Sequence, residues 1–230
     1  MSGKVTVGAR HALLVATTNR GKLAELRALL ASLPVDVVSV DEAGAASLVV
    51  VEDGGTFEAN ATKKALAYSA ATMMLTLADD SGLEVDALGG APGVRSARFA
   101  SETATDAENN AALLAALAAV AEHHPAELRE SGFPARFRCV LALHDPFAPG
   151  EREAIVDGRC EGGIVASPRG DGGFGYDPLF LLAGRSITMA ELADGEKNTV
   201  SHRGQAFRRL VPLLEKRILA RDEAIRRIVR

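Results

Sequence analysis

The chain has 230 residues, 47% of them hydrophobic and 24% charged, with a formal net charge of -4 at pH 7. This composition supports a substantial core, so we expect a single domain over residues 1–230 with a flexible segment at residues 1–10. The acidic balance argues against a nucleic-acid-binding protein, and the lack of a long apolar run or a signal peptide argues against a membrane or secreted protein, so we expect a cytoplasmic location.

The first predicted unit is a strand, a polar turn and a helix. Residues 11–17 form a short apolar run, and leucines at helical spacing begin at Leu23. Such a turn directs backbone N–H groups and the positive end of the helix dipole at whatever lies above the strand, which suits a phosphate group. It is not a Walker P-loop, because the first glycine of that motif is absent, and an ordinary solvated turn is the alternative. The turn consists of Thr17, Thr18, Asn19, Arg20, Gly21 and Lys22.

Two apolar runs farther along the chain each end in carboxylates, and each run predicts a buried strand. Residues 48–51 precede Glu52, and residues 75–78 precede Asp79 and Asp80. Ligands of α/β sheets bind just beyond the strand ends, so we expect the two acidic ends to meet. Glu52 and Asp80 can then share a Mg²⁺ ion, which often uses one or two carboxylates together with substrate phosphates. An acidic turn that caps the next element is the alternative.

Two helices have recognisable starts. Thr56 is the predicted N-cap of a helix that carries Asn60 and Lys64. Thr105 and Glu108 form a capping-box pattern at the start of an Ala/Leu helix, which we interpret as structural.

Three further strands complete the predicted sheet. They are residues 35–40, 136–143 and 153–160. The last two alternate between apolar and polar residues, which indicates an antiparallel pair and therefore a mixed sheet. Cys139 and Cys160 fall inside these two strands without metal-ligand or nucleophile spacing, so we expect them to pack in the core.

A glycine-rich loop at residues 170–180 contains two of the chain's few aromatic residues. Glycines let the backbone approach a flat ligand, and Phe174 or Tyr176 can stack on a base. The alternative is that these aromatic rings only hold the loop in place.

The last predicted helix follows Lys197 and begins near Ser201. Ser201 as N-cap puts His202 and Arg203 at the positive end of the helix, where two side-chain donors suit an anion or a carbonyl oxygen. The alternative is that His202 only has a local partner at the helix start and that Lys197 is a solvated lysine. Pro212 is expected to kink or break the helix.

Seven motifs, in this order, closely resemble the inosine triphosphate pyrophosphatase family, also called noncanonical purine NTP pyrophosphatases. The resemblance runs from about residue 12 to about residue 215. Each motif alone is weak, whereas seven in the same order are specific. The motifs are residues 16–22, residues 52–57, Asn60 with Lys64, residues 78–83, residues 89–93, residues 172–178 and residues 201–204.

This resemblance implies an α/β fold with an elongated central mixed sheet flanked by helices, and two lobes with a substrate cleft between them. It implies a homodimer that hydrolyses ITP, dITP and XTP between the α and β phosphates with Mg²⁺, releasing pyrophosphate. It also implies that Glu52 and Asp80 bind the metal and that Asp80 is the catalytic residue, the proposed base. The substrate-binding positions that it implies are Thr17, Thr18, Asn19, Arg20, Gly21, Lys22, Lys64, Ser81, Phe174, Gly175, Tyr176, Asp177, Lys197, His202 and Arg203.

The implied chemistry suggests roles for these groups. Lys22, Lys64 and a helix N-terminus would offset the negative charge that develops on the phosphates. A carboxylate bound to Mg²⁺ is a poor base because the cation lowers its pKa. We therefore expect Asp80 mainly to position a metal-bound water, with Asp79 or Glu52 as a second acceptor.

The chain departs from the family pattern at two positions. Thr18 stands where the family often has glycine, and Ala59 stands where it commonly has a second glutamate. If that glutamate serves as a helix cap, its loss would lower stability by only a fraction of the ~1 kcal/mol that a cap contributes. If it orders a metal-bound water, its loss would lower activity. The alternatives are a Maf-type pyrophosphatase acting on pyrimidine or modified nucleotides, and a nucleotide-binding module without turnover.

Overall fold

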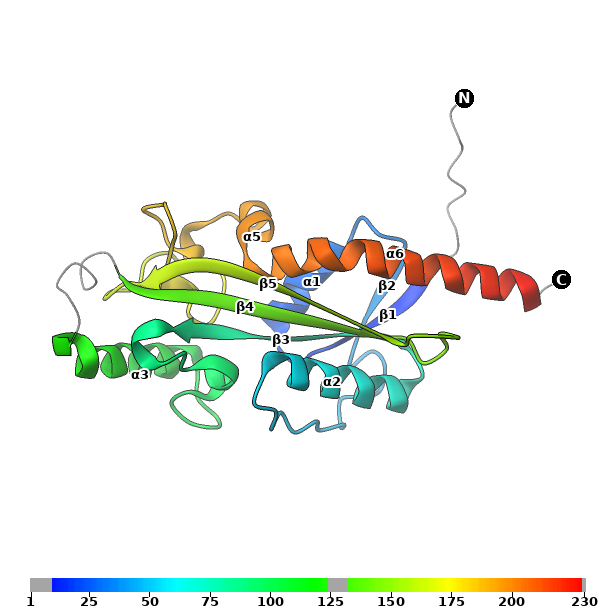
Figure 1. Ribbon diagram of the computed structural model, residues 1–230, viewed down its shortest axis with the longest axis horizontal. Helices are drawn as coiled ribbons and strands as arrows, with labels where there is room; N and C mark the ends of the chain where they lie inside the picture. Colours follow the sequence, from blue (N-terminus) through cyan, green and yellow to red (C-terminus); the bar gives the residue numbers. More distant parts are fainter. Residues whose placement is uncertain (1–9, 124–131, 229–230) are drawn as a thin grey trace, which may run out of the picture.

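The computed structural model describes residues 10–123 and 132–228, and it is elongated, with one central sheet between two layers of helices (Figure 1). The predicted flexible segment at residues 1–10 lies outside the described residues except for Arg10, which forms an ion pair with Asp36 at 2.6 Å. The strands are β1 (His11–Ala16), β2 (Val35–Ser39), β3 (Leu75–Val85), β4 (Phe133–His144), β5 (Glu153–Ile164) and β6 (Phe180–Leu182). The helices are α1 (Arg20–Leu30), α2 (Phe57–Thr72), α3 (Asp106–Val120), α5 (Asp194–Val200) and α6 (His202–Ile228). The short 3₁₀ helices are η1 (Asp86–Leu88), η2 (Gly93–Arg98), η3 (Ala121–His123), η4 (Asp177–Leu179) and η5 (Met189–Glu191).

The sheet is mixed, as the sequence predicts. In the described part of the chain its six strands follow the order β2-β1-β3-β4-β5-β6. β1 runs parallel to β2 and β3, whereas the pairs β3–β4, β4–β5 and β5–β6 are antiparallel. Helices α1, α5 and α6 cover one face, and α2 and α3 cover the other (Figure 1). The predicted α/β fold with an elongated mixed sheet is therefore confirmed.

The two aspartates do not lie at a strand end. β3 continues through them to Val85, and Asp79 and Asp80 pair with Leu141 and Val140 of β4. The strand that ends beside Ala78 is β1, the parallel neighbour of β3, because its last residue, Ala16, pairs with Ala78. The prediction of a strand that stops at residue 78 is therefore wrong. The carboxylates instead lie inside a long strand, where the loss of β1 leaves one edge of β3 open.

Residues 48–51 form no strand, so that prediction is also wrong. Val49 and Val51 are 82% and 62% exposed, while Leu48 and Val50 pack partly against the core. An isolated run rich in β-branched residues needs a free sheet edge to become a strand. Residues 48–51 take up no such edge; the Tyr68 hydroxyl of α2 donates to Leu48 O at 3.1 Å instead.

The helix starts agree with the sequence. The side chain of Thr56 accepts a hydrogen bond from Ala59 N at 3.1 Å, Thr105 forms a complete capping box, and Ser201 Oγ accepts one from Gly204 N at 3.1 Å. The sequence predicts a kink or a break at Pro212; α6 continues through Pro212 to Ile228 as one helix, so the break does not occur. Proline removes a single intrahelical hydrogen bond, and the buried leucines on either side of Pro212 hold the helix on the sheet.

The core divides between the two ends of the sheet. In one lobe, α1 and α6 pack on one face of β1 and β3, and α2 packs on the other face. In the second lobe, α3 and the segment around residues 176–192 pack on the far ends of β3, β4 and β5. Cys139 and Cys160 are buried in this core as free thiols, as predicted.

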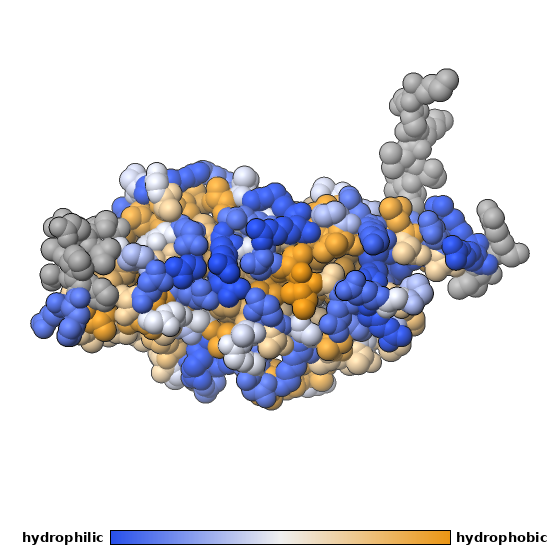
Figure 2. Space-filling model, viewed as in Figure 1, coloured by the Kyte–Doolittle hydropathy of each residue, from blue (hydrophilic) through white to orange (hydrophobic). Residues whose placement is uncertain are grey.

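Hydrophilic and apolar areas are interspersed on the face seen in Figure 2, and one apolar area is exposed near its centre. None of the helices in the described residues combines the length and the hydropathy that crossing a bilayer requires.

Candidate active site

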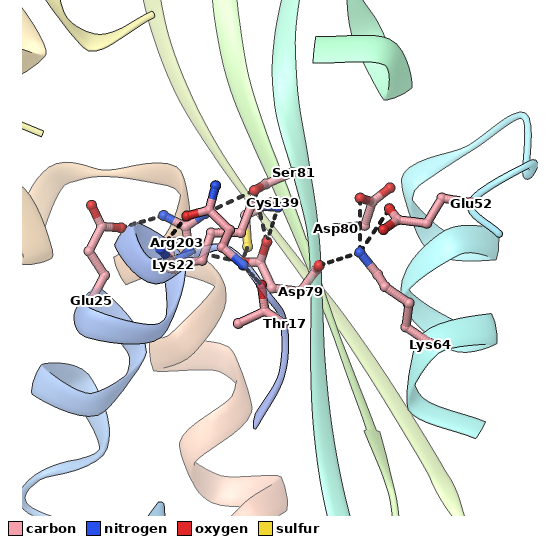
Figure 3. A network of polar contacts seen from close by, with 11 residues as sticks. Thr17, Lys22, Glu25, Glu52, Lys64, Asp79, Asp80, Ser81, Cys139 and Arg203 are labelled. Atoms are coloured by element: carbon pink, nitrogen blue, oxygen red, sulfur yellow. Dashed lines mark hydrogen bonds and ion pairs between the residues drawn. The ribbon is translucent and has the colours of Figure 1, made fainter. Parts of the chain in front are cut away.

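Asp79 and Asp80 organise the two halves of the site. Successive side chains of a strand point to opposite faces of a sheet, so the two carboxylates diverge. Figure 3 shows Asp80 beside Glu52 and Lys64 on one side of β3, and Asp79 beside Lys22 and Arg203 on the other. The sequence did not decide between the two aspartates, and this alternation separates their roles.

On the first side, one lysine joins two carboxylates. The ammonium of Lys64 lies 2.9 Å from Glu52 Oε2 and 3.3 Å from Asp80 Oδ1, and it donates to the carbonyl oxygen of Asp79 at 2.8 Å. Burial and the neighbouring Glu52 raise the pKa of Asp80 to about 6, against the opposing effect of Lys64. Burial alone would raise the pKa of Glu52 as well, but Lys64 outweighs it and lowers that pKa. The predicted meeting of Glu52 and Asp80 is therefore confirmed.

This pair suits a cation that needs few protein ligands. Asp80 Oδ2 is buried, and no donor among the described residues hydrogen-bonds to it. The described residues contain no cluster of three or more His, Cys, Asp or Glu side chains that could hold a metal. Two carboxylate groups with a spare oxygen match Mg²⁺, which takes its other ligands from water and from substrate phosphates.

On the second side, Asp79 is fully buried and bound by two cations. Its carboxylate lies 2.7 Å from the ammonium of Lys22 and 2.8 Å from Arg203 Nε, and it accepts hydrogen bonds from Ser81 Oγ at 2.8 Å and Cys139 Sγ at 3.2 Å. Burial would raise the pKa of Asp79, but Arg203 and Lys22 hold it well below 3.8. A carboxylate that faces away from Asp80 and is already committed to these partners is no acceptor for a water at the other side. Asp79 is therefore not the second acceptor for the attacking water that the sequence suggested.

The charged network continues from Asp79 toward the glycine-rich loop. Arg203 and Lys197 both contact the carboxylate of Glu25, with Lys197 at 2.6 Å, and Lys197 also lies 2.7 Å from Asp177. Glu25 is a residue of this network that no motif in the sequence singles out. The only available signal was an acid one helical turn after Lys22, on the same face of α1.

An aromatic cavity lies beside this network. Phe174 packs so closely on Gly21 that a Cβ at that glycine would lie 2.5 Å from the ring. The cations of Lys197 and Arg203 lie 5.0 and 5.7 Å from the centroid of the same ring. The cavity lining includes Asn19, Lys22, Ser81, Phe137, Phe174, Gly175, Tyr176, Asp177, Lys197, His202 and Arg203.

His202 forms one wall of this cavity. Its ring stacks on Phe137 with centroids 4.8 Å apart, and its Nδ1 is buried without a hydrogen-bond partner among the described residues. Burial and the nearby Arg203 lower the pKa of His202 well below 6.5, so the imidazole is neutral. A neutral imidazole with a free ring nitrogen can exchange one hydrogen bond with a flat polar ligand.

A second, charged cavity adjoins the aromatic one. It has a volume of about 480 Å³, and the residues that line both cavities are Asn19, Lys22, Ser81 and Ala97. The predicted site residues that line the charged cavity are Thr17, Thr18, Asn19, Lys22, Glu52, Lys64, Asp80 and Ser81. Of the predicted residues, only Arg20 and Gly21 line neither cavity; Arg20 is exposed at the start of α1, and Gly21 supports Phe174.

The model of the Ham1 family matches residues 13–213, which is most of the chain. The chain belongs to the Ham1 family. The dITP/XTP pyrophosphatase of Anaeromyxobacter dehalogenans is 46% identical to this Ham1 chain, over 88% of the chain and 96% of the relative. The dITP/XTP pyrophosphatase of Desulforamulus reducens is 48% identical, over 89% of the chain and 96% of the relative.

Two solved structures share the fold of this Ham1 chain. A HAM1 protein from Coxiella burnetii has a TM-score of 0.76 and 40% identity, covering 90% of this chain and 99% of its own. A nucleoside-triphosphatase / dITP/XTP pyrophosphatase from Mycobacterium abscessus has a TM-score of 0.66 and 44% identity, covering 87% and 99%. The family resemblance stated from the motifs is therefore confirmed.

The structure bears on both departures of this Ham1 chain from the family pattern. Ala59 donates its N–H to Thr56 Oγ1, so half of a capping box persists without the glutamate side chain. Thr18 is exposed at the edge of the charged cavity, where its side chain displaces no buried group.

Proposed function

We propose that this protein hydrolyses the noncanonical purine nucleoside triphosphates ITP, dITP and XTP to the monophosphate and pyrophosphate. The observation that carries the proposal is the junction of the aromatic cavity with the charged one at Lys22 and Ser81. A nucleotide has a flat base and a polyanionic chain, and these adjoining cavities match its two parts. The names of the curated relatives, dITP/XTP pyrophosphatases, support the same substrates.

The base would occupy the aromatic cavity. Phe174 and Tyr176 line this cavity, where they would contact the base, and the unpaired Nδ1 of buried His202 offers a hydrogen bond. Hypoxanthine and xanthine carry an acceptor at O6, where adenine carries an amino donor. A neutral His202 protonated at Nδ1 would donate to that O6, and adenine would leave the same buried N–H without a partner. Discrimination by such hydrogen bonds reaches roughly 10⁴ to 10⁵.

The triphosphate would occupy the charged cavity, opposite the start of α1. Asn19 caps this helix by accepting from Lys22 N at 3.0 Å, which leaves the first N–H groups of the helix for an anion. Lys22 and Lys64 approach the cavity from opposite sides of β3 and would offset the charge that develops on the phosphate oxygens.

Glu52 and Asp80 are the residues that would hold Mg²⁺, with Asp80 Oδ2 available as a ligand oxygen. When bound, Mg²⁺ would neutralise phosphate charge and lower the pKa of the attacking water. Asp80 would orient that water toward the α phosphorus, and Lys64 would hold both carboxylates in place through its contacts of 2.9 and 3.3 Å. Asp79 would keep Lys22 and Arg203 aligned at the junction of the two cavities.

We also propose that the protein is a homodimer and acts in the cytoplasm, where the nucleotide pool is found. The homodimer is supported by the family resemblance and by exposed apolar side chains such as Phe147, which is 62% exposed. The apolar area near the centre of Figure 2 is a surface of the kind that subunits cover.

The test is pyrophosphate release from a nucleotide panel with and without Mg²⁺. We expect rapid release from ITP, dITP and XTP, little from dATP or dTTP, and none after chelation of the metal. Preference for dTTP or dUTP would instead indicate a Maf-type enzyme. Binding of dITP without turnover would indicate a nucleotide-binding module.

A further inference from the structure

The backbone that carries Glu52 has little regular structure of its own. Residues 46–55 belong to neither a helix nor a strand. Helix α2 holds both sides of this segment: Asn60 hydrogen-bonds to Gly54 N at 2.8 Å and to Gly54 O at 3.3 Å, and the Tyr68 hydroxyl donates to Leu48 O at 3.1 Å. None of these contacts reaches the peptide group of Glu52. Lys64 holds the carboxylate of Glu52, so what still needs a support is the backbone from which this side chain projects.

Arg98, the last residue of η2 and part of the lining of the charged cavity, provides that support. Its Nη2 donates to the backbone carbonyl oxygen of Glu52 at 2.8 Å. The side chain is 25% exposed and lines the cavity, with Glu102 as a more distant ion-pair partner at 3.6 Å. Glu52 is therefore held between α2 on one side and the end of η2 on the other.

Helix η2 is itself firmly attached. Ser96 Oγ accepts from Leu83 N at 2.8 Å and donates to Gly93 O at 2.6 Å. The hydroxyl of Tyr176 donates to Ser96 O at 2.9 Å, which ties η2 to the aromatic loop. At Gly82 a Cβ would lie 2.4 Å from Ser96 Oγ, so η2 lies directly against β3, two residues after Asp80. The support that bears Arg98 is thus fixed to the strand that bears the second carboxylate.

We propose that Arg98 is a positioning residue that sets the distance between the carboxylates of Glu52 and Asp80. The inference rests on the proposed function, in which these two residues hold a divalent cation. Arg98 acts on the cation through the peptide group of Glu52 rather than by touching it. The competing role is direct contact with a substrate phosphate, since Arg98 also lines the charged cavity.

The two roles predict opposite effects on cation binding in the absence of nucleotide. A guanidinium near a cation site repels the cation, so removing its charge alone would tighten binding. Loss of a group that orients a metal ligand typically weakens metal binding by 10- to 100-fold. The sign of the change therefore separates positioning from charge.

The experiment is a titration of the full chain with Mn²⁺, followed by electron paramagnetic resonance, without nucleotide. We expect Arg98→Ala to raise the Kd for Mn²⁺ by about tenfold or more. The matched control is Arg95→Ala, because Arg95 lies on the same helix, is 55% exposed and lines neither cavity; it contacts Glu102 at 3.0 Å and the carbonyl oxygen of Arg98 at 3.4 Å, but not Glu52. This control should leave the Kd unchanged. Hydrogen exchange should increase at residues 46–55 in Arg98→Ala alone, with β3 still protected.

A Kd for Mn²⁺ that is unchanged or lower in Arg98→Ala overturns the inference, even if nucleotide binding weakens, because Arg98 is then a phosphate ligand. Faster exchange throughout the chain also overturns it, since the role is then general stability. If the wild-type protein binds no Mn²⁺, the proposed cation site fails. The local exchange comparison then decides on Arg98 separately.

Discussion

Asp79 and Asp80 are predicted to respond in opposite ways to the same substitution. Asp79→Asn removes the charge that balances Lys22 and Arg203 inside the protein. Breaking a buried ion pair by removing one partner costs about 3–5 kcal/mol. Glu25 still contacts Arg203, so we expect a loss near 3 kcal/mol, which corresponds to a fall in Tm of roughly 10 °C for a chain of this size.

Asp80→Asn should abolish turnover without destabilising the protein. Burial raises the pKa of Asp80 to about 6 from 3.8, so at pH 7 its ionised form lowers the stability of the folded state by up to about 3 kcal/mol. Asparagine removes this cost, and Lys64 keeps Glu52 as a partner at 2.9 Å. The free energy of unfolding should therefore stay the same or rise.

The assays are thermal unfolding at pH 7 and pyrophosphate release from dITP, with wild-type protein as the reference. An Asp79→Asn variant that unfolds at the wild-type temperature, or an Asp80→Asn variant with near-normal turnover, would contradict the roles given to these two aspartates. A large fall in Tm for Asp80→Asn would likewise contradict the assignment of the two faces of β3.

The remaining predictions concern the aromatic cavity and the core. Because burial lowers the pKa of His202 well below 6.5, its ring signals should not titrate in NMR spectra near the pH at which a free imidazole does. Below pH 6.5 His202 takes up a proton in the unfolded chain but not in the folded protein, so the free energy of unfolding should fall by up to about 1.4 kcal/mol per pH unit. In unfolding measured against pH, His202→Gln should remove this slope. Gly21→Ala places a carbon 2.5 Å from the Phe174 ring, so kcat/KM for dITP should fall by roughly 10- to 100-fold with little change in Tm; wild-type kinetics would show that the ring position does not matter. Burial raises the pKa of Cys139 well above 9.0 and that of Cys160 to about 11, so neither thiol should react with DTNB until the protein unfolds.

Features set by neighbouring residues in the sequence could be predicted. The caps at Thr56, Thr105 and Ser201 depend on groups within three residues, and each forms as expected. The antiparallel pair β4–β5 follows from alternation within each strand. Local hydrogen bonding and side-chain period determine these elements, so a single sequence carries enough information.

Features set by distant residues could not be predicted in the same way. Residues 48–51 have the composition of a strand, but they form none, and the Tyr68 hydroxyl of α2 binds Leu48 O instead. Asp79 and Asp80 resemble a turn, yet they continue a strand because Arg203 and Lys64, from distant helices, compensate their buried charge. Glu25 carried only the weak signal of its spacing from Lys22, because its partners are more than 150 residues away in the chain. Each of these outcomes depends on tertiary partners rather than on local propensity.

The most direct test is a crystal structure with Mg²⁺ and α,β-methylene-dITP, an analogue that cannot be cleaved between the α and β phosphates. We predict the base against Phe174 with O6 near His202, the phosphates between Lys22 and Lys64, and the cation on Glu52 and Asp80. A nucleotide bound elsewhere, or a cation that contacts neither carboxylate, would contradict the account.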